Sequence, residues 1–261
     1  MIPDPSFWHR LADAADRETL AHFRDGAAVE NKLREGFDPV TVADRAAERA
    51  IRGIIREAFP DDAILGEEMG AEDRPGGRRW VIDPIDGTRA FVAGIPVWTT
   101  LIGLEIDGRS VAGLVSQPCT GERFLAVDGT AKLYRADAVQ PLRAGGGAPS
   151  DAIVMTVDPF LFDGEARDAF QAVRREARLV RYSADAYAFC AVAAGSVQVA
   201  FERGVQPYDV GALIPLVEAA GGLFTTWTGD RAEKGGDVVA AATPELHEWA
   251  LSHLRPVASL R

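Results

Sequence analysis

Residues 80–88 read WVIDPIDGT, an apolar run that leads into two aspartates three positions apart. Pro84 fixes the backbone φ angle between Asp83 and Asp86, and Gly87 permits a tight turn after them. We expect this turn to direct both carboxylates into one small volume. Two carboxylates at close range repel each other, so they require protons or cations. Because oxygen ligands suit Mg²⁺, the stretch predicts a magnesium site at the end of a short strand.

An ordinary turn is the alternative explanation for the same stretch. Asp-Pro and Asp-Gly pairs are common in turns that have no chemical role. Thr88 follows the turn, where its side-chain oxygen can cap a new helix. Backbone amides of Gly87 and Thr88 at a helix N-terminus would suit a phosphate group. The choice between the two explanations depends on which other acidic residues reach this place.

Three further acidic motifs are candidates, and each also has a local structural explanation. Glu67 and Glu68 follow an apolar pair and would lie in a solvated turn after a short strand. Asp209 would open a helix over 210–220, where Asp is a common N-cap. Residues 41–44 read TVAD, which fits a capping box at the start of a helix.

The first half of the chain predicts an α+β arrangement. Apolar residues at helical spacing indicate helices over 5–25 and 42–58, the second ended by Pro60. The pairs Asp107-Gly108 and Asp128-Gly129 each predict a β-hairpin. We therefore expect residues 1–143 to place two helices against an antiparallel sheet and to carry most of the acidic motifs. Strands are predicted over 80–82, 98–105, 111–117, 123–127 and 131–134, and a loop over 70–79 that is a candidate lid.

The second half predicts an α/β region over residues 144–261, which contains Asp209. Glycines and a proline within 144–150 indicate the boundary between the two regions. Beyond it, strands alternate with helices, as in α/β layers. The predicted strands cover 153–157, 179–182, 197–201 and 238–241, and the predicted helices cover 165–177, 185–194, 210–220 and 245–254.

Composition excludes several classes of protein. The 261 residues include 39 Asp and Glu against 28 Lys and Arg, a formal net charge of −11. Nucleic acids and anionic membranes are polyanions, so this balance argues against both as partners. The longest uncharged run, residues 186–201, is shorter than the roughly 20 residues of a spanning helix. Residues 1–10 lack the basic and apolar pattern of a signal peptide, so we expect a cytoplasmic protein.

The acidic motifs together resemble a known family. In order and spacing, Glu67-Glu68, residues 83–88 and Tyr208-Asp209 are similar to the motifs of the inositol monophosphatase family, whose members are Mg²⁺-dependent, Li⁺-sensitive phosphomonoesterases. The resemblance covers Val40 to Gly222. It implies a layered αβαβα sandwich, and it also implies a homodimer, as many members are.

The resemblance implies a set of metal ligands. Glu67 and Asp83 would hold one Mg²⁺ together with the backbone carbonyl of Ile85. Asp83, Asp86 and Asp209 would hold a second ion. Glu67 would also face a third, weaker ion, so that the site takes two or three Mg²⁺, with Mn²⁺ as a possible replacement.

Catalytic and phosphate-binding roles follow from the same resemblance. Asp44 and Thr88 would orient and deprotonate the attacking water, with Glu67 beside them in the catalytic set. The amides of Gly87 and Thr88 would bind the phosphate. The sequence contains neither Cys-x₅-Arg nor Asp-x-Asp-x-Thr, the motifs of phosphatases with a covalent nucleophile, which favours direct attack by water.

Two segments indicate which phosphate ester is the substrate. Residues 183–189 and the stretch 208–215 are similar to those of the histidinol-phosphate phosphatases within this family. This implies hydrolysis of L-histidinol phosphate to L-histidinol and phosphate, a step of histidine biosynthesis. Histidinol carries an ammonium and an imidazole, so Asp185 and Glu202 would pair with a cationic leaving group. Asp185 also has the alternative explanation of a helix N-cap.

Other functions stay open at this point. An inositol-1-phosphate phosphatase would use the same metal ligands. A bisphosphate nucleotidase, a fructose bisphosphatase or a non-catalytic, metal-binding regulator are further alternatives. The complete set of acidic motifs argues against the regulator, because loss of activity usually accompanies a lost ligand.

Overall fold

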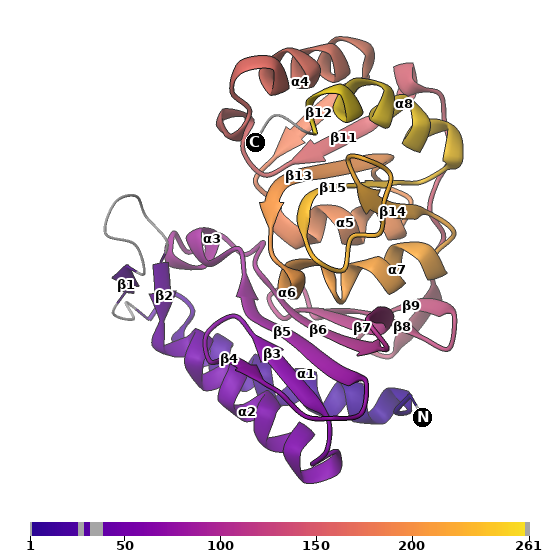
Figure 1. Cartoon of the computed structure of the whole chain (residues 1–261). Helices are drawn as coiled ribbons and strands as arrows, with labels where there is room; N and C mark the ends of the chain where they lie inside the picture. The colour runs from indigo at the N-terminus through magenta and orange to yellow at the C-terminus, as the bar shows by residue number, and fades with distance from the viewer. Residues whose placement is uncertain (1, 26–28, 32–38, 259–261) are drawn as a thin grey trace.

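The fold consists of five stacked layers (Figure 1). The structure is a computed structural model that describes residues 2–25, 29–31 and 39–258. From one side to the other, the layers are helix, sheet, helix, sheet and helix, so the predicted αβαβα sandwich is confirmed. The outer helices α1 (Pro5–His22) and α2 (Val42–Ala58) cover one sheet, α5 (Asp185–Ala193), α6 (Pro207–Val210) and α7 (Leu213–Ala219) lie between the sheets, and α4 (Gly164–Glu176) and α8 (Pro244–Leu254) cover the other.

The first sheet has eight strands in the order β10-β9-β8-β7-β6-β5-β3-β4. Neighbouring strands are antiparallel except β3 and β5, which are parallel. Both predicted hairpins are present, and Asp107 and Asp128 take the positive φ angles that such tight turns need. The strands are β3 (Ala63–Gly66), β4 (Gly70–Glu72), β5 (Arg78–Asp86), β6 (Thr99–Ile106), β7 (Arg109–Gln117), β8 (Glu122–Val127), β9 (Thr130–Arg135) and β10 (Ala138–Pro141).

Smaller elements complete the N-terminal half. Strands β1 (Val29–Asn31) and β2 (Pro39–Thr41) form a separate antiparallel pair, and the short helix α3 (Thr88–Val92) follows β5. The prediction of a loop throughout 70–79 is wrong at both ends, because β4 and the first residues of β5 occupy them. Backbone pairing of β4 with β3 overrides the Gly- and Pro-rich composition there.

The second sheet has five strands in the order β12-β11-β13-β15-β14. Strand β11 runs parallel to β12 and β13, whereas β15 runs antiparallel to β13 and β14. The expected alternation of strands and helices is present, and the division at residues 144–150 stays a prediction. The strands are β11 (Ile153–Thr156), β12 (Leu179–Tyr182), β13 (Val199–Val205), β14 (Leu223–Thr226) and β15 (Gly236–Ala241).

Helix α2 shows how the outer layer is fixed to the first sheet. It begins with the predicted capping box, in which Thr41 accepts a hydrogen bond from Ala43 N and Asp44 accepts one from Thr41 N. Its apolar stripe, which includes Ile51 and Ile55, is fully buried against Trp80 and its neighbours. The capping box therefore fixes Asp44 in a buried position at the start of α2.

Glycines let the central helices lie directly on the first sheet. Gly103 and Gly113 are paired across β6 and β7. A Cβ at Gly113 would lie 2.4 Å from Ala212 O, and a Cβ at Gly211 would lie 2.1 Å from Val81 Cγ2. Side chains at these positions would push α6 and α7 away from the strands, so the glycines bring the segment around Asp209 close to β5.

The prediction of one helix over 210–220 is wrong, because the segment breaks into α6 and α7. Pro207 starts α6 early, and Gly211 follows it where the chain passes the sheet most closely. Among the described residues, no helix is long and apolar enough to span a membrane.

The glycine contact predicts a stability difference between two alanine substitutions. We expect Gly113→Ala to lower the free energy of unfolding by about 1–3 kcal/mol, because its methyl group would meet the backbone of Ala212. Gly53→Ala, on the exposed side of α2 with no atom within 4 Å of the new Cβ, should leave stability unchanged or raise it by up to ~1 kcal/mol. Urea unfolding of both variants measures the difference, and equal effects would contradict this account of the sheet–helix contact.

Candidate active site

A β-bulge shapes the centre of the site. In the pairing of β5 with β6, Asp83 lies opposite Leu101 but Asp86 lies opposite Thr99, so β5 carries one extra residue between them. In a regular strand, residues three apart point to opposite faces, and a bulge changes that alternation. Thr100 Oγ1 donates a 2.7 Å hydrogen bond to Pro84 O and fixes the bulge. The strand thus runs further than predicted, through Asp86, and the bulge takes the place of the expected turn.

Three carboxylates converge at this bulge. Asp83, Asp86 and Asp209 each offer an oxygen, and these oxygens lie within 4.8 Å of one another. The explanation of Asp209 as a helix N-cap is wrong. Pro207 starts α6 two residues before Asp209, and Gln206 is the cap. Asp209 instead accepts a 2.6 Å hydrogen bond from Gln206 N, which fixes its carboxylate at the start of α6.

A cavity of about 350 Å³ opens over this cluster. Nine of the ten predicted site residues line it, including Ile85, whose backbone carbonyl was the predicted ligand. Asp44 is the residue that does not line it. The cavity-lining residues of the predicted set are Glu67, Asp83, Ile85, Asp86, Gly87, Thr88, Asp185, Glu202 and Asp209.

Glu67 and Asp44 lie on the β3 side of the cluster. Glu67 follows β3, and its backbone N–H donates to Ile82 O at 3.1 Å. Its carboxyl shares a hydrogen bond with the carboxyl of Asp83. Asp44 is fully buried, and its negative charge interacts with that of Glu67. Its Oδ2 accepts from Thr41 N and Oγ1, whereas Oδ1 has no hydrogen-bond partner among the described residues.

Burial and mutual repulsion raise the pKa values of Asp83 and Asp86. The pKa of Asp83 lies well above its usual range because of burial and the charges of Glu67, Asp86 and Asp209. The pKa of Asp86 is likewise raised well above its usual range by burial and by Asp185 and Asp209. Protons or cations must therefore neutralise part of this charge.

The segment after the bulge is held by two features. Gly87 has a φ angle of 82°, and a Cβ there would lie 3.0 Å from Asp185 Oδ2, so glycine satisfies both the backbone and the packing. Thr88 Oγ1 donates a 2.9 Å hydrogen bond to Ile85 O. Because its hydrogen is used in that bond, the hydroxyl oxygen can only accept from a further group.

Asp185 and Glu202 also line the cavity. The alternative explanation of Asp185 as a helix N-cap is wrong, because Ala184 is the cap residue. Asp185 has a φ angle of 45°, a conformation that Asp tolerates better than most residues. Burial together with Asp185 and Asp209 raises the pKa of Glu202 to about 8. These two acidic residues line the cavity but do not belong to the three-carboxylate cluster.

Two arginines that were not predicted as functional residues also line the cavity. Arg89 follows Thr88. Burial raises the pKa of Asp185, and the charge of Arg89 opposes part of that rise. Arg203 follows Glu202 and pairs with Asp163 at 3.1 Å. Each arginine is next in sequence to a predicted site residue, and this position is the sequence feature that could have indicated its place in the cavity.

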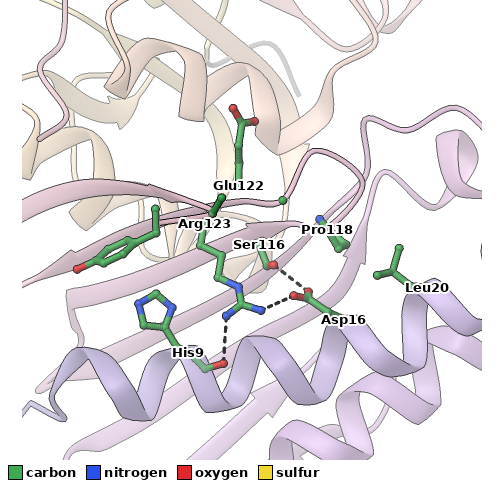
Figure 2. Close-up of a pocket in the computed structure, with 10 residues that line it drawn as sticks. His9, Asp16, Leu20, Ser116, Pro118, Glu122 and Arg123 are labelled. Carbon is green, nitrogen blue, oxygen red and sulfur yellow. Dashed lines mark hydrogen bonds and ion pairs between the residues drawn. The ribbon is translucent and has the colours of Figure 1, made fainter. Parts of the chain in front are cut away.

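A second cavity, of about 340 Å³, lies where α1 crosses β7 and β8 (Figure 2). Its one arginine is already bound by two aspartates. Arg123 Nη2 pairs with Asp13 at 2.6 Å and with Asp16 at 2.7 Å, and Ser116 Oγ donates to Asp16 at 2.8 Å. The carboxylate cavity has a similar volume, but six carboxyls and only two arginines line it, so it is the better candidate for a cation and an anionic ligand together.

The residues of the carboxylate cavity fit Mg²⁺. Every side-chain donor of the cluster is a carboxylate oxygen, and the buried Oδ1 of Asp44 lacks a partner among the described residues. Mg²⁺ prefers oxygen ligands and is usually held through a few carboxylates with water in its other positions. Ile85 O already accepts from Thr88, but a carbonyl oxygen has a second lone pair.

Comparison with known proteins agrees with this geometry. The model of the inositol monophosphatase family matches residues 7–259. A histidinol-phosphatase of Chlorobaculum parvum is 36% identical over 93% of this chain and 93% of its own length, and one of Mycobacterium tuberculosis is 34% identical over 94% and 95%. The solved structure of an inositol monophosphatase from Zymomonas mobilis superimposes with a TM-score of 0.84 at 35% identity, covering 96% of both chains. With the match extending over almost its whole length, this chain belongs to the inositol monophosphatase family.

Proposed function

We propose that this phosphatase is a Mg²⁺-dependent enzyme that hydrolyses L-histidinol phosphate to L-histidinol and phosphate. The observation that carries the proposal is a single cavity that holds two sets of acidic residues. One set is the cluster of Asp83, Asp86 and Asp209, and the other is Asp185 and Glu202, which lie next to it. The first set suits metal ions and the second suits a cationic alcohol.

The proposed substrate explains why both sets of acidic residues are needed. A phosphate monoester is an anion, so it approaches the cluster only if cations neutralise the carboxylates. The histidinol portion carries an ammonium and an imidazole, and it pairs with Asp185 and Glu202. The histidinol-phosphatases of Chlorobaculum parvum and Mycobacterium tuberculosis support this substrate.

We assign the metal ligands as the sequence predicted them. Glu67, Asp83 and Ile85 O hold one Mg²⁺, and Asp83, Asp86 and Asp209 hold a second. When bound, Mg²⁺ supplies positive charge that stabilises the phosphate oxygens and the leaving oxygen and lowers the pKa of water. A third ion at Glu67, and Mn²⁺ in place of Mg²⁺, belong to the same proposal.

The chain's own residues orient the attacking water and the phosphate. Thr88 Oγ1 donates to Ile85 O, so it accepts a hydrogen bond from the water and holds its oxygen toward phosphorus. Burial raises the pKa of Asp44 to about 6, close to the range of an effective general base, and Asp44 with Glu67 takes the proton. The amides of Gly87 and Thr88 bind the phosphate oxygens. A cytoplasmic homodimer is the predicted setting of the enzyme.

Inositol-1-phosphate is the second candidate substrate. The inositol monophosphatase of Zymomonas mobilis, with 35% identity, favours it. The neutral hydroxyls of inositol would not require Asp185 and Glu202 as charged partners, which is why histidinol phosphate ranks first.

A panel of esters tests the substrate. Phosphate release is measured with Mg²⁺ on histidinol phosphate, inositol-1-phosphate, fructose-1,6-bisphosphate and an adenosine bisphosphate. We expect the highest kcat/KM on histidinol phosphate. Strong preference for any other ester would contradict the substrate, and no turnover of any ester would favour a regulator.

A substitution at Asp185 separates substrate recognition from chemistry. Asp185→Asn keeps the size of the side chain and tolerates the same backbone angle, but it removes the charge. We expect kcat/KM for histidinol phosphate to fall about 10–100-fold, the size of one or more charge-assisted hydrogen bonds. The value for inositol-1-phosphate should change by less than about threefold. Equal losses on both esters would remove Asp185 from specificity.

The repulsion within the cluster predicts how metal affects stability. Without divalent cations, Asp83→Asn should be more stable than the wild type, because it removes one of the repelling buried charges. With Mg²⁺ at about 100 times its dissociation constant, the wild type should gain roughly 2.7 kcal/mol and the variant much less. Thermal unfolding with EDTA and with Mg²⁺ measures both effects. An equal gain in both proteins would place the bound metal elsewhere.

A further inference from the structure

Helix α2 buries a pair of charged side chains that the mechanism does not use. Arg52 Nε lies 2.8 Å from Glu48 Oε1, and their side chains are 2% and 0% exposed. Removing two charges from water is costly, so a buried ion pair needs further hydrogen bonds to be tolerated. Neither residue lines the carboxylate cavity.

The further hydrogen bonds go to the turn that follows β3. Glu48 Oε2 accepts from Glu68 N at 2.8 Å, and Oε1 accepts from Met69 N at 3.2 Å. Arg52 Nη2 donates to Gly70 O. The ion pair therefore binds three consecutive residues through their backbone, two in the turn and the first residue of β4.

Glu67 is the residue immediately before these three. Its own N–H is bound to Ile82 O on β5. On its other side, Glu48 holds the next two amides, so the backbone on either side of Glu67 is fixed. A Cβ at Gly66 would lie 2.0 Å from Glu48 Oε1, which means that the Glu48 carboxylate fills the space a side chain would take there.

We propose that Glu48, supported by Arg52, is a positioning residue that holds Glu67 in place to bind metal. The inference rests on the proposed role of Glu67 as a ligand. It gives the buried charge pair a purpose, because a carboxylate at the tip of a turn needs a fixed backbone to keep a ligand geometry. It also accounts for Gly66 immediately before the Glu67-Glu68 pair.

Glu48→Gln tests the proposal with little change of volume. One of the two side-chain atoms becomes an NH₂ group that faces an N–H donor, so at least one backbone hydrogen bond to the turn is lost. Residues around metal ligands typically change metal affinity about 10–100-fold when substituted. We expect a loss of that size in affinity for Mn²⁺.

Glu105→Gln is the matched control. Glu105 on β6 is also buried, and it also accepts from an arginine, with Arg79 Nε at 2.8 Å and Nη2 at 2.6 Å. It does not line the cavity. Both substitutions therefore perturb a buried glutamate that accepts hydrogen bonds from an arginine, although Arg79 is partly exposed and Arg52 is not. Only Glu48 holds the Glu67 turn.

The measurement is Mn²⁺ binding to the full chain without substrate, followed through the electron paramagnetic resonance signal of free Mn²⁺. Glu48→Gln should weaken the binding of at least one Mn²⁺ about 10–100-fold, while Glu105→Gln stays within about twofold of the wild type. The Mg²⁺ concentration for half-maximal phosphate release should shift in parallel. Gly66→Ala, which displaces Glu48 without removing any charge, should act in the same direction if Glu48→Gln does not fold.

The possible failures are distinguishable. Unchanged Mn²⁺ binding in folded Glu48→Gln or Gly66→Ala, or an equal loss in Glu105→Gln, would overturn the positioning role alone. A wild type that binds no Mn²⁺ would overturn the metal ligands as well. Turnover of a different ester would affect only the proposed substrate.

Discussion

Repulsion among buried carboxylates is the constraint that shapes the centre of this molecule. Asp83, Asp86 and Asp209 bring their oxygens within 4.8 Å of one another, and Glu67 shares a hydrogen bond with Asp83. Isolated side chains would not choose this arrangement, because each charge disfavours the others in a partly dry site. The surrounding fold must therefore hold the groups by their backbones, and bound cations would remove the electrostatic cost.

Each layer near the site contributes to that restraint. The bulge in β5 orients Asp83 and Asp86 within one strand. The paired glycines of β6 and β7 let α6 approach until Asp209 joins them. Helix α2, on the other face of the sheet, holds the turn behind Glu67 through Glu48. The acidity of the chain thus supplies the charge that a metal-dependent phosphatase concentrates at one place.

The parts of the fold that depend on short-range patterns could be predicted from the sequence. The Asp-Gly hairpins and the capping box at Thr41–Asp44 are set by neighbouring residues, and both are present. The bulge at Pro84 and the break between α6 and α7 could not be predicted in the same way. Both arise from contacts with distant strands, Thr100 in one case and Val81 in the other. The acidic residues that line the cavity were predictable from their motifs, although Asp44 of the capping box does not line it, whereas Arg89 and Arg203 enter it only through the tertiary fold.

The central claim is that this fold holds four carboxylates from three segments as one metal site. A crystal of the wild type soaked in Mn²⁺, with diffraction recorded near the manganese absorption edge, tests it most directly. The account predicts anomalous peaks among Asp83, Asp86 and Asp209, with the Glu67 carboxylate bound to one of the ions and its turn still held by Glu48. No peak in this cavity, or peaks with Glu67 turned away from the ions, would contradict it.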